Sequence, residues 1–361
     1  MDRLKRTAIS SSACHRVGWK AVWGWLALAL IGLLIVSLSI TQGAVVIPAG
    51  QSFLALADAA MDANRSTLSA SQQMIIVELR WPRTLFALLI GAILALCGAV
   101  MQGVFRNPIA DPGIIGVSSG AALGAAIAIV LLPATMGGML TPFFAFFSGL
   151  LTTLLVYRLA QSTAEGAGTS VLMLLLAGVG MAALSSAAVG LLTYIADDKS
   201  LRSLMLWGMG SLTYSDGPVL SVLAVSLLLL WGYFQYHAKA LNALVLGEAQ
   251  AMHLGVDTEK LKRGLIIAVS IGVALTVSAS GLIGFISLVV PHLIRLTMGP
   301  DHRYLLFLSL YVGAILLLLA DIGARVLLAP AEIPVGLITA FIGAPFLVFL
   351  LLSQRQRLSQ F

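Results

Sequence analysis

The feature that most constrains this chain is a series of almost uninterrupted apolar segments, each about 20 residues long. Soluble domains typically contain about 25% charged residues, whereas this chain contains 10% charged and 59% hydrophobic residues. The apolar residues run continuously through each segment and do not alternate with polar ones, which is typical of a spanning helix and not of a barrel strand. The sequence therefore predicts an all-α membrane protein that crosses the bilayer many times.

We predict ten spans, joined by polar or glycine- and proline-containing connections. The eighth span is short, and Pro291 inside it predicts a broken helix. Between the fifth and sixth spans, the middle of residues 196–218 is apolar enough to predict a short helix near the outer surface. The predicted spans are 22–41, 82–105, 114–132, 142–160, 170–194, 218–237, 262–281, 283–297, 304–322 and 335–352.

Lys and Arg are distributed unequally between the connections. With the N-terminus in the cytoplasm, fifteen of the 21 Lys and Arg residues lie on the cytoplasmic side and six on the outer side. This is the positive-inside bias of an even number of spans with both termini in the cytoplasm. We predict a basic cytoplasmic leader over residues 1–21 and one transmembrane domain over 22–361. Because no extramembranous domain presents a basic face, the net charge of +6 does not indicate nucleic-acid binding.

Two motifs for chemistry within the chain are missing. The dipeptide Gly-Lys does not occur, which excludes a phosphate-binding loop of the P-loop type, and HExxH is absent. Cys14 and Cys97 are the only cysteines, too few for a disulfide framework or a zinc site. Ion-driven carriers need ionisable groups deep in the bilayer; Asp321 comes closest, and Arg325 one helical turn later can pair with it. These features favour a passive pathway that another protein drives.

Three stretches resemble one known family. They read "ELRWPRTLFALLIGAILALCGAVMQGVFRNPIADPGIIGVSSGAALGA" over 78–125, "LNALVLGEAQAMHLGVDTEKLK" over 241–262, and "SGLIGFISLVVPHLIRLTMG" through "PFLVFLLL" over 280–352. In this order they resemble the iron-chelate and vitamin-B12 permease family, the membrane subunits of type II ABC importers. The stretch after residue 100 is most similar to the haem-importing branch.

The resemblance implies a homodimer of ten-helix subunits around a central translocation path in the bacterial inner membrane. Two cytoplasmic ATPase subunits and a periplasmic binding protein are the implied partners, besides membrane lipid. The chain itself is then no enzyme and binds no permanent cofactor, with haem or a related iron chelate as transported substrate. A ferric-siderophore or cobalamin permease is the alternative, and an ion-gradient-driven secondary carrier a remoter one. No role is assigned to residues 43–75.

The resemblance places a cytoplasmic gate after the second span, at Asn107, Pro108 and Ile109. Proline fixes its own φ and disfavours helix in the residue before it, so Asn107-Pro108 and Asp111-Pro112 predict a non-helical turn. An ordinary short connection between helices is the alternative. A weaker match places a second gate element after the fourth span, near Ser162 and Thr163.

A polar, amphipathic insert between spans six and seven matches the family's coupling segment, residues 241–262. The resemblance implies a short helical pair that docks into a cleft on the ATPase, with glycines that punctuate it, apolar side chains that become buried and polar ones at the rim. The rival interpretation is an amphipathic helix lying on lipid. The coupling residues are Gly247, Glu248, Ala249, Met252, His253, Leu254 and Gly255.

At the outer mouth, Arg80, Arg83 and Arg325 match arginines that receive carboxylates of the binding protein. A guanidinium group stays charged and binds a carboxylate through two hydrogen bonds. The alternatives are snorkelling to the interface and, for Arg325, a structural pair with Asp321.

The substrate path is a further hypothesis. Arg202 lies among apolar neighbours in the outer segment, an arrangement that suits an amphiphilic anion, although a plain surface arginine fits equally well. Met205 and Met209 are candidates for loose contact with haem, and core packing explains them as well.

Overall fold

The computed structural model describes residues 11–43, 45–63, 65–161, 169–213 and 216–358. The described chain is built from helices, which confirms the all-α prediction. They are α1 (Ser11–Thr41), α2 (Ala49–Met61), α3 (Ala70–Met74), the π-helix η1 (Ile75–Arg80), α4 (Trp81–Val104), the 3-10 helix η2 (Pro112–Ile115), α5 (Val117–Leu131), α6 (Ala134–Ala160), α7 (Val171–Ile195), α8 (Asp198–Gly208), α9 (Gly217–Tyr236), α10 (Ala238–Val245), α11 (Glu248–His253), α12 (Thr258–Ser280), α13 (Ile286–Met298), α14 (His302–Val326) and α15 (Val335–Leu358).

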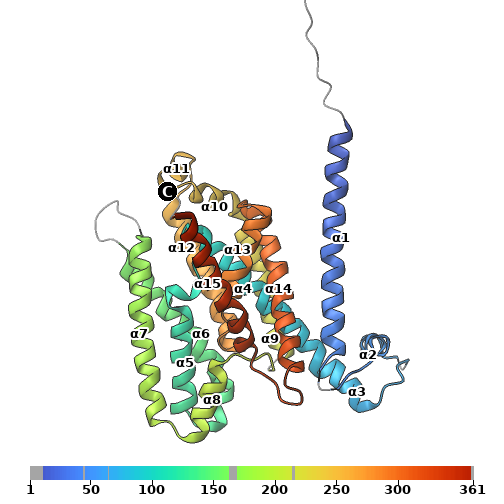
Figure 1. Cartoon of the computed structure of the whole chain (residues 1–361). Coiled ribbons are helices and arrows are strands. Elements are labelled where there is room, and N and C mark those ends of the chain that lie inside the picture. Colours follow the sequence, from blue (N-terminus) through green and yellow to red (C-terminus); the bar gives the residue numbers. More distant parts are fainter. Residues whose placement is uncertain (1–10, 44, 64, 162–168, 214–215, 359–361) are drawn as a thin grey trace, which may run out of the picture.

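The long helices run side by side between two ends of a bundle (Figure 1). One end, at the top of Figure 1, carries α10 and α11 together with the start of α1 and the end of α15. The opposite end carries α2, α3 and α8. We call them the α11 end and the α8 end. The described parts of the first and last helices therefore begin and finish at the same end, as the predicted even number of spans requires.

Each predicted span overlaps one apolar helix. Among the described residues, seven helical runs are long and apolar enough to cross a membrane: α1, residues 70–104, α6, α7, α9, α12 and α14. The other three predicted spans coincide with the shorter apolar helices α5, α13 and α15. Ten crossings stays a prediction, and α5, α13 and α15 are the helices on which it depends.

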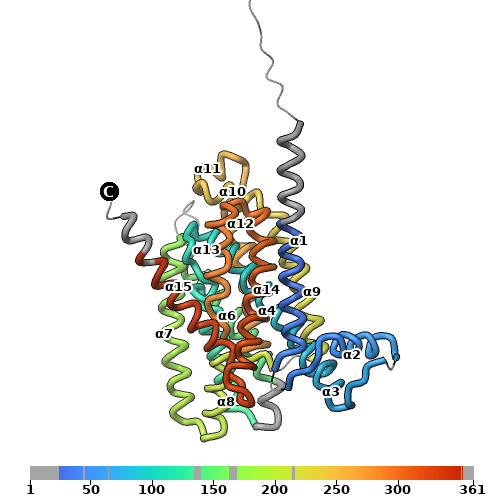
Figure 2. Tube along the Cα trace, turned by 45° about the vertical axis from the view of Figure 1, so that its right-hand side comes forward, coloured from blue at the N-terminus to red at the C-terminus, as the bar shows by residue number. Residues whose placement is uncertain are grey.

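The helix α4 forms the centre of the bundle. In the most apolar window of residues 70–104, 83% of the residues are buried, against 17% in α7 and in α9, which lie at the periphery (Figure 2). Along one side α4 packs on α14, where a Cβ added to Gly91 would lie 2.3 Å from the carbonyl oxygen of Gly313. Glycines facing each other in this way let two helix backbones approach closely.

The small residues 120–128 pack densely against the neighbouring helix, as their spacing predicts. A Cβ on Gly124 would lie 2.2 Å from the carbonyl oxygen of Phe144, so α5 and α6 are in backbone contact. The second small-residue stretch, 177–190, behaves differently: Gly178 touches the backbone of the connection before α5, but Gly180 has no other atom within 4 Å of an added Cβ. Dense packing is therefore correct for the first stretch and only in part for the second.

The helical run through α4 starts earlier than its predicted beginning at residue 82. It begins after Ser69, whose side chain and that of Gln72 form a capping box. Pro82 lacks an amide hydrogen, and its ring crowds the carbonyl four residues before it. The helix accommodates Pro82 by widening into the π-helix η1, where the amide of Trp81 donates to Ile76 O. The predicted span begins at Pro82, whereas in the structure this proline lies inside a continuous helical run.

The described residues between 43 and 75 form a small substructure at the α8 end. There α2 lies beside the end of α1, and a second apolar core joins Ile40, Ile47, Ala55 and Ile76. The carboxylate of Asp58 accepts two backbone amide hydrogens that follow α2, which fixes the connection to α3. This segment braces the junction between α1 and α4.

The prediction of a helix broken at Pro291 is wrong, because α13 continues through that residue. The break lies earlier, at the non-helical residues 281–285, where φ is 71° at Gly281 and 68° at Phe285. The start of α13 lies against the last third of α4, because a Cβ on Gly98 would meet the backbone of Ser287. Since the helix starts inside the bundle, it needs fewer residues to reach the α11 end.

Candidate functional site

The residues singled out from the sequence separate between the two ends of the bundle. Residues 107–109 and 247–255 belong to the α11 end, since α4 finishes there: a Cβ added to Gly103 would meet Leu241 and His302. The predicted docking arginines and α8 belong to the opposite end (Figure 1). The two groups predicted to act on opposite sides of a membrane are thus a helix length apart.

A non-helical turn follows α4, as predicted. Arg106 has a φ of 49°, in the left-handed region. The amide of Asn107 donates to Gln102 O, and its side-chain oxygen accepts the amide hydrogen of Ile109, both at 3.1 Å. The second bond is the local closure that asparagine makes in turns, and it passes over Pro108, which has no hydrogen to donate. The turn is confirmed; its role as a gate stays a prediction.

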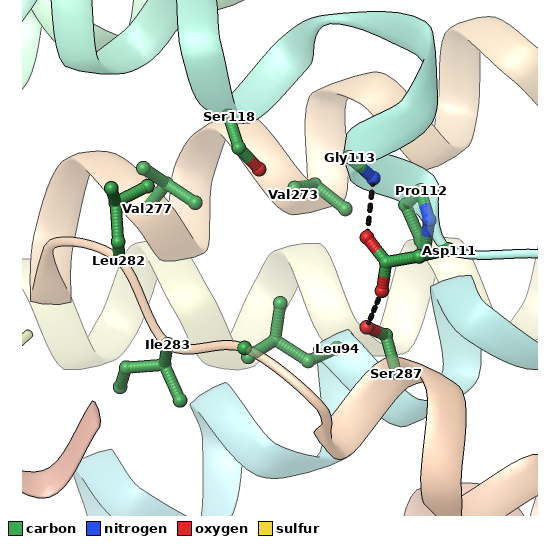
Figure 3. Close-up of a pocket in the computed structure, with 11 residues that line it drawn as sticks. Leu94, Asp111, Pro112, Gly113, Ser118, Val273, Val277, Leu282, Ile283 and Ser287 are labelled. Carbon is green, nitrogen blue, oxygen red and sulfur yellow. Dashed lines mark hydrogen bonds between the residues drawn. The ribbon is translucent and has the colours of Figure 1, made fainter. Parts of the chain in front are cut away.

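A cavity of about 140 Å³ lies beyond this turn, where the connection to α5 faces α13. Asp111 borders it (Figure 3) and accepts the amide hydrogen of Gly113 at 2.7 Å and the hydroxyl hydrogen of Ser287. One carboxylate thereby joins the connection after α4 to the first turn of α13. The rest of the lining is mostly apolar and includes Leu94, Pro112, Val273, Val277, Leu282 and Ile283.

Ser162 and Thr163, the weaker gate candidates, lie outside the described residues. The residues on either side of 162–168 are held together: Gln161 pairs with Thr169 in an antiparallel bridge, and the amide of Ser170 donates to Ala160 O at 3.3 Å. The end of α6 and the start of α7 are therefore fixed to each other.

The predicted coupling segment folds as the expected helical pair, α10 and α11. Gly247 and Gly255 separate the helices, with φ of 126° and 81°, values that favour glycine. The exposed residues are Leu246, which follows α10, and Ala249, Met252, His253 and Leu254 in or directly after α11. Met252 and Leu254 expose 57% and 66% of their surface, so the tip of this end presents an apolar face.

A polar cluster fastens α10 to the start of α14 and was not predicted. Asn242 donates to Asp301 Oδ1 at 2.7 Å and accepts the amide hydrogen of His302 at 2.9 Å. The hydrogen bonds from Asn242 and from the Arg303 amide lower the pKa of the Asp301 carboxyl. The sequence signal for this cluster was the Asp before an apolar helix, a typical N-cap, but the partner on α10 has no sequence signature.

At the α8 end, the guanidinium of Arg80 is occupied within the chain. It donates to Ile40 O and Thr41 O, each at 2.8 Å, and to Val45 O, and Arg80 is only 6% exposed. The carbonyls of Ile40 and Thr41 belong to the end of α1, where helix carbonyls lack partners within the helix, and Val45 follows that helix. Arg80 therefore supplies the C-terminal cap of α1.

Arg83 and Arg325 share one buried carboxylate. Asp321, which is 0% exposed, lies 2.9 Å from Arg83 Nη2 and 3.0 Å from Arg325 Nε. Arg325 also donates to the carbonyl and hydroxyl oxygens of Ser39, at 3.0 and 2.9 Å. Arg83 reaches outward to Glu332 at 2.7 Å. The alternative of an Asp321–Arg325 pair is confirmed, and we call these four charged residues the outer charge cluster.

The candidate path residues lie on and after α8. Arg202 and Met205 are exposed on the helix, and Met209, which follows it, is 37% exposed. The chain after α8 is joined to the last residue of α12, because the amide of Ser211 donates to Ser280 O at 2.7 Å. This confirms the predicted short helix; contact with a substrate stays a prediction.

Among the residues that the structure describes, no group of three His, Cys, Asp or Glu is arranged to hold a metal ion. What the fold presents is a set of apolar helices, polar turns at both ends and an exposed helical pair at one of them. These features define a multi-pass helical membrane protein.

Residues 28–353 match the FecCD transport family, and the chain belongs to this family. It is 43% identical to the hemin transport system permease protein of Yersinia pestis over 286 residues, which cover 78% of this chain and 84% of that protein. It is 41% identical to the vitamin B12 import system permease protein of Vibrio parahaemolyticus over 288 residues, 80% of this chain and 85% of that one.

A solved structure agrees with these relatives. The chain resembles a metal-chelate type ABC transporter in an inward-facing conformation, with a TM-score of 0.77 and 35% sequence identity, over 91% of this chain and 98% of that one. The family predicted from the three sequence stretches is therefore confirmed.

Proposed function

We propose that this chain is the membrane-spanning permease subunit of an ATP-driven importer that takes haem, or a related iron chelate, from a periplasmic binding protein across the bacterial inner membrane. It works as a homodimer around one path, with ten spans per subunit and both termini in the cytoplasm, and two separate subunits hydrolyse the ATP. The observation that carries the proposal is the α10–α11 pair, because its exposed apolar tip at one end of a membrane bundle suits docking into another protein.

In this proposal each end has its own task. The turn at Asn107, Pro108 and Ile109 is the inner gate, and residues 247–255 bind the ATPase. At the outer end the internal bonds of Arg80 and Arg325 favour a narrower docking site than the sequence suggests. Arg83, which points toward the exposed Glu332, meets the binding protein, while the two other arginines hold the rim in place.

Haem is preferred as cargo because the first-named relative is a hemin permease, but its margin over the vitamin B12 relative is only 43% against 41% identity. The test reconstitutes the chain with its ATPase subunit in vesicles and adds binding protein loaded with haem, ferric siderophore or cobalamin in turn. We expect haem-loaded protein to stimulate ATP hydrolysis and uptake. Stimulation by cobalamin alone would reassign the cargo, and uptake that persists with a catalytically inactive ATPase but stops with an uncoupler would indicate a secondary carrier.

The path hypothesis predicts the effect of reversing one charge. Arg202→Glu should lower the uptake rate of an anionic chelate by about tenfold, because a charge at a mouth sets how often an anion enters. Lys199→Glu is the matched control, an exposed cation on the same helix. Initial rates of haem uptake at low salt measure both. Equal rates for wild type and Arg202→Glu would remove Arg202 from the path.

A further inference from the structure

Lys262 is buried as completely as the apolar core. It lies near the start of α12, at the α11 end, and its side chain is 1% exposed. An ammonium group withdrawn from water is strongly unfavourable unless opposite charges and hydrogen bonds surround it. We therefore expect the groups that surround this ammonium group to hold fixed positions in the structure.

The ammonium group joins three segments of the chain. Its Nζ lies 3.0 Å from Glu248 Oε2 in α11, 2.5 Å from Glu259 Oε1 in its own helix, and 3.1 Å from the carbonyl oxygen of Thr169 before α7. We call these four residues the Lys262 junction. Glu248 is the first residue of α11, so a displacement of that helix acts directly on the ammonium group.

The Thr169 side of the junction is held firmly. The amide and the hydroxyl of Thr169 each donate to Glu259 Oε2 at 2.9 Å. Its hydroxyl oxygen also lies 3.3 Å from the hydroxyl of Tyr157 in α6. The antiparallel bridge between Thr169 and Gln161 joins the residue after α6 to the same segment. Through Thr169, the end of α6 and the start of α7 belong to the same cluster of bonds as α12.

The exposed tip and the buried junction are consecutive in the chain. Glu248 begins the helix that carries Met252, a side chain with 57% of its surface exposed. The same short helix therefore offers one face to a partner and one carboxylate to Lys262. Because α11 is short and bounded by Gly247 and Gly255, it can shift as a unit, and Lys262 is the group that such a shift meets first.

We propose that Lys262 is a positioning residue for transport, which transmits displacement of α11 to the joined ends of α6 and α7. The proposal rests on the proposed function, in which α11 is moved by the ATPase. An ionic junction of this kind keeps α11 and the α6–α7 pair moving together. Without it, the ATPase moves α11 while the membrane helices respond less, and ATP is hydrolysed with less uptake.

The test compares uptake per ATP hydrolysed in vesicles that contain the permease, its ATPase and haem-loaded binding protein. Lys262→Met keeps the length of the side chain and removes its charge, and we expect this ratio to fall by about tenfold, within the usual range of coupling between sites. Lys262→Arg should restore most of it, since a guanidinium group can reach the same acceptors. The matched control is Lys260→Met, which removes an exposed lysine paired with Asp257 and should keep the wild-type ratio.

A double-mutant cycle separates the junction from direct ATPase contact and from misfolding. Glu248→Gln should lower the ratio in the wild-type background. It should have almost no further effect in Lys262→Met, because both changes remove the same contact between Lys262 and Glu248. Additive effects, an unchanged ratio in Lys262→Met, or an equal loss in Lys260→Met would overturn the proposal. If Lys262→Met does not fold, the test compares uptake per ATP hydrolysed in Glu248→Gln and in Glu248→Gln/Lys262→Arg. Effects of the two substitutions that are independent of each other again overturn the proposal. A wild-type complex without ATP-dependent uptake would instead refute the proposed function.

Discussion

Replacing Asp321 with Asn should lower the free energy of unfolding by about 3–5 kcal/mol, the usual loss when one partner of a buried ion pair is removed. Asp321 is fully buried and lies within 3.0 Å of both Arg83 and Arg325. Asparagine has almost the same shape but no charge. Arg83 keeps Glu332 as a partner, whereas Arg325 loses its carboxylate while its side chain is 6% exposed.

Glu332→Gln is the matched control for this prediction. Glu332 pairs with the same Arg83, but its side chain is 49% exposed, so the change should cost less than about 1 kcal/mol. Thermal unfolding of the purified protein in detergent compares the two variants. Hydrogen exchange should also rise at the end of α1 in Asp321→Asn, since Arg325 holds Ser39 there.

Two results would contradict this account of the outer charge cluster. Equal stability losses for both variants would mean that burial does not set the strength of these pairs. Unchanged stability together with lost binding of the periplasmic protein would mean that the arginines serve docking and not the internal fold. The measurement therefore decides between the two roles that the sequence left open for Arg325.

What could be predicted from the sequence depended on local signals. Continuous apolar segments locate the helices, and the four-residue spacing of Asp321 and Arg325 indicates their pair. Asn107-Pro108 indicates the turn after α4. Each of these is a property of residues close in the chain, and the structure shows all of them.

What could not be predicted depends on acceptors without a signature. Arg80 binds backbone carbonyls of residues 40, 41 and 45, and any residue type carries a carbonyl. Lys262 meets Thr169, 93 positions away, again through a carbonyl. From the sequence, a lone basic residue near a predicted membrane surface is interpreted as a contact for lipid or for another protein. Only the tertiary structure shows that its side chain already donates hydrogen bonds within the chain.

Gly98→Ala should be the most disruptive single-methyl change in the bundle core. An added Cβ would lie 1.8 Å from the carbonyl oxygen of Ser287 and 2.5 Å from its carbonyl carbon. Both are backbone atoms, so no side chain can turn aside, and the start of α13 must move. Overpacking of a core typically costs about 1–3 kcal/mol and occasionally more. A backbone-to-backbone clash at this distance belongs at or above the upper limit of that range.

The functional effect of Gly98→Ala should exceed its effect on stability, because Ser287 also holds Asp111 on the connection that follows the gate turn. We expect haem uptake to be lost even in the fraction that folds. Gly180→Ala on α7 is the matched control: it adds the same methyl group where nothing lies within 4 Å, and alanine favours a helix by about 1 kcal/mol over glycine. Yield, thermal unfolding and uptake are measured for both. If the two variants behave alike, α13 does not begin against α4 at Gly98, and the contact between the turn after α4 and α13 does not exist.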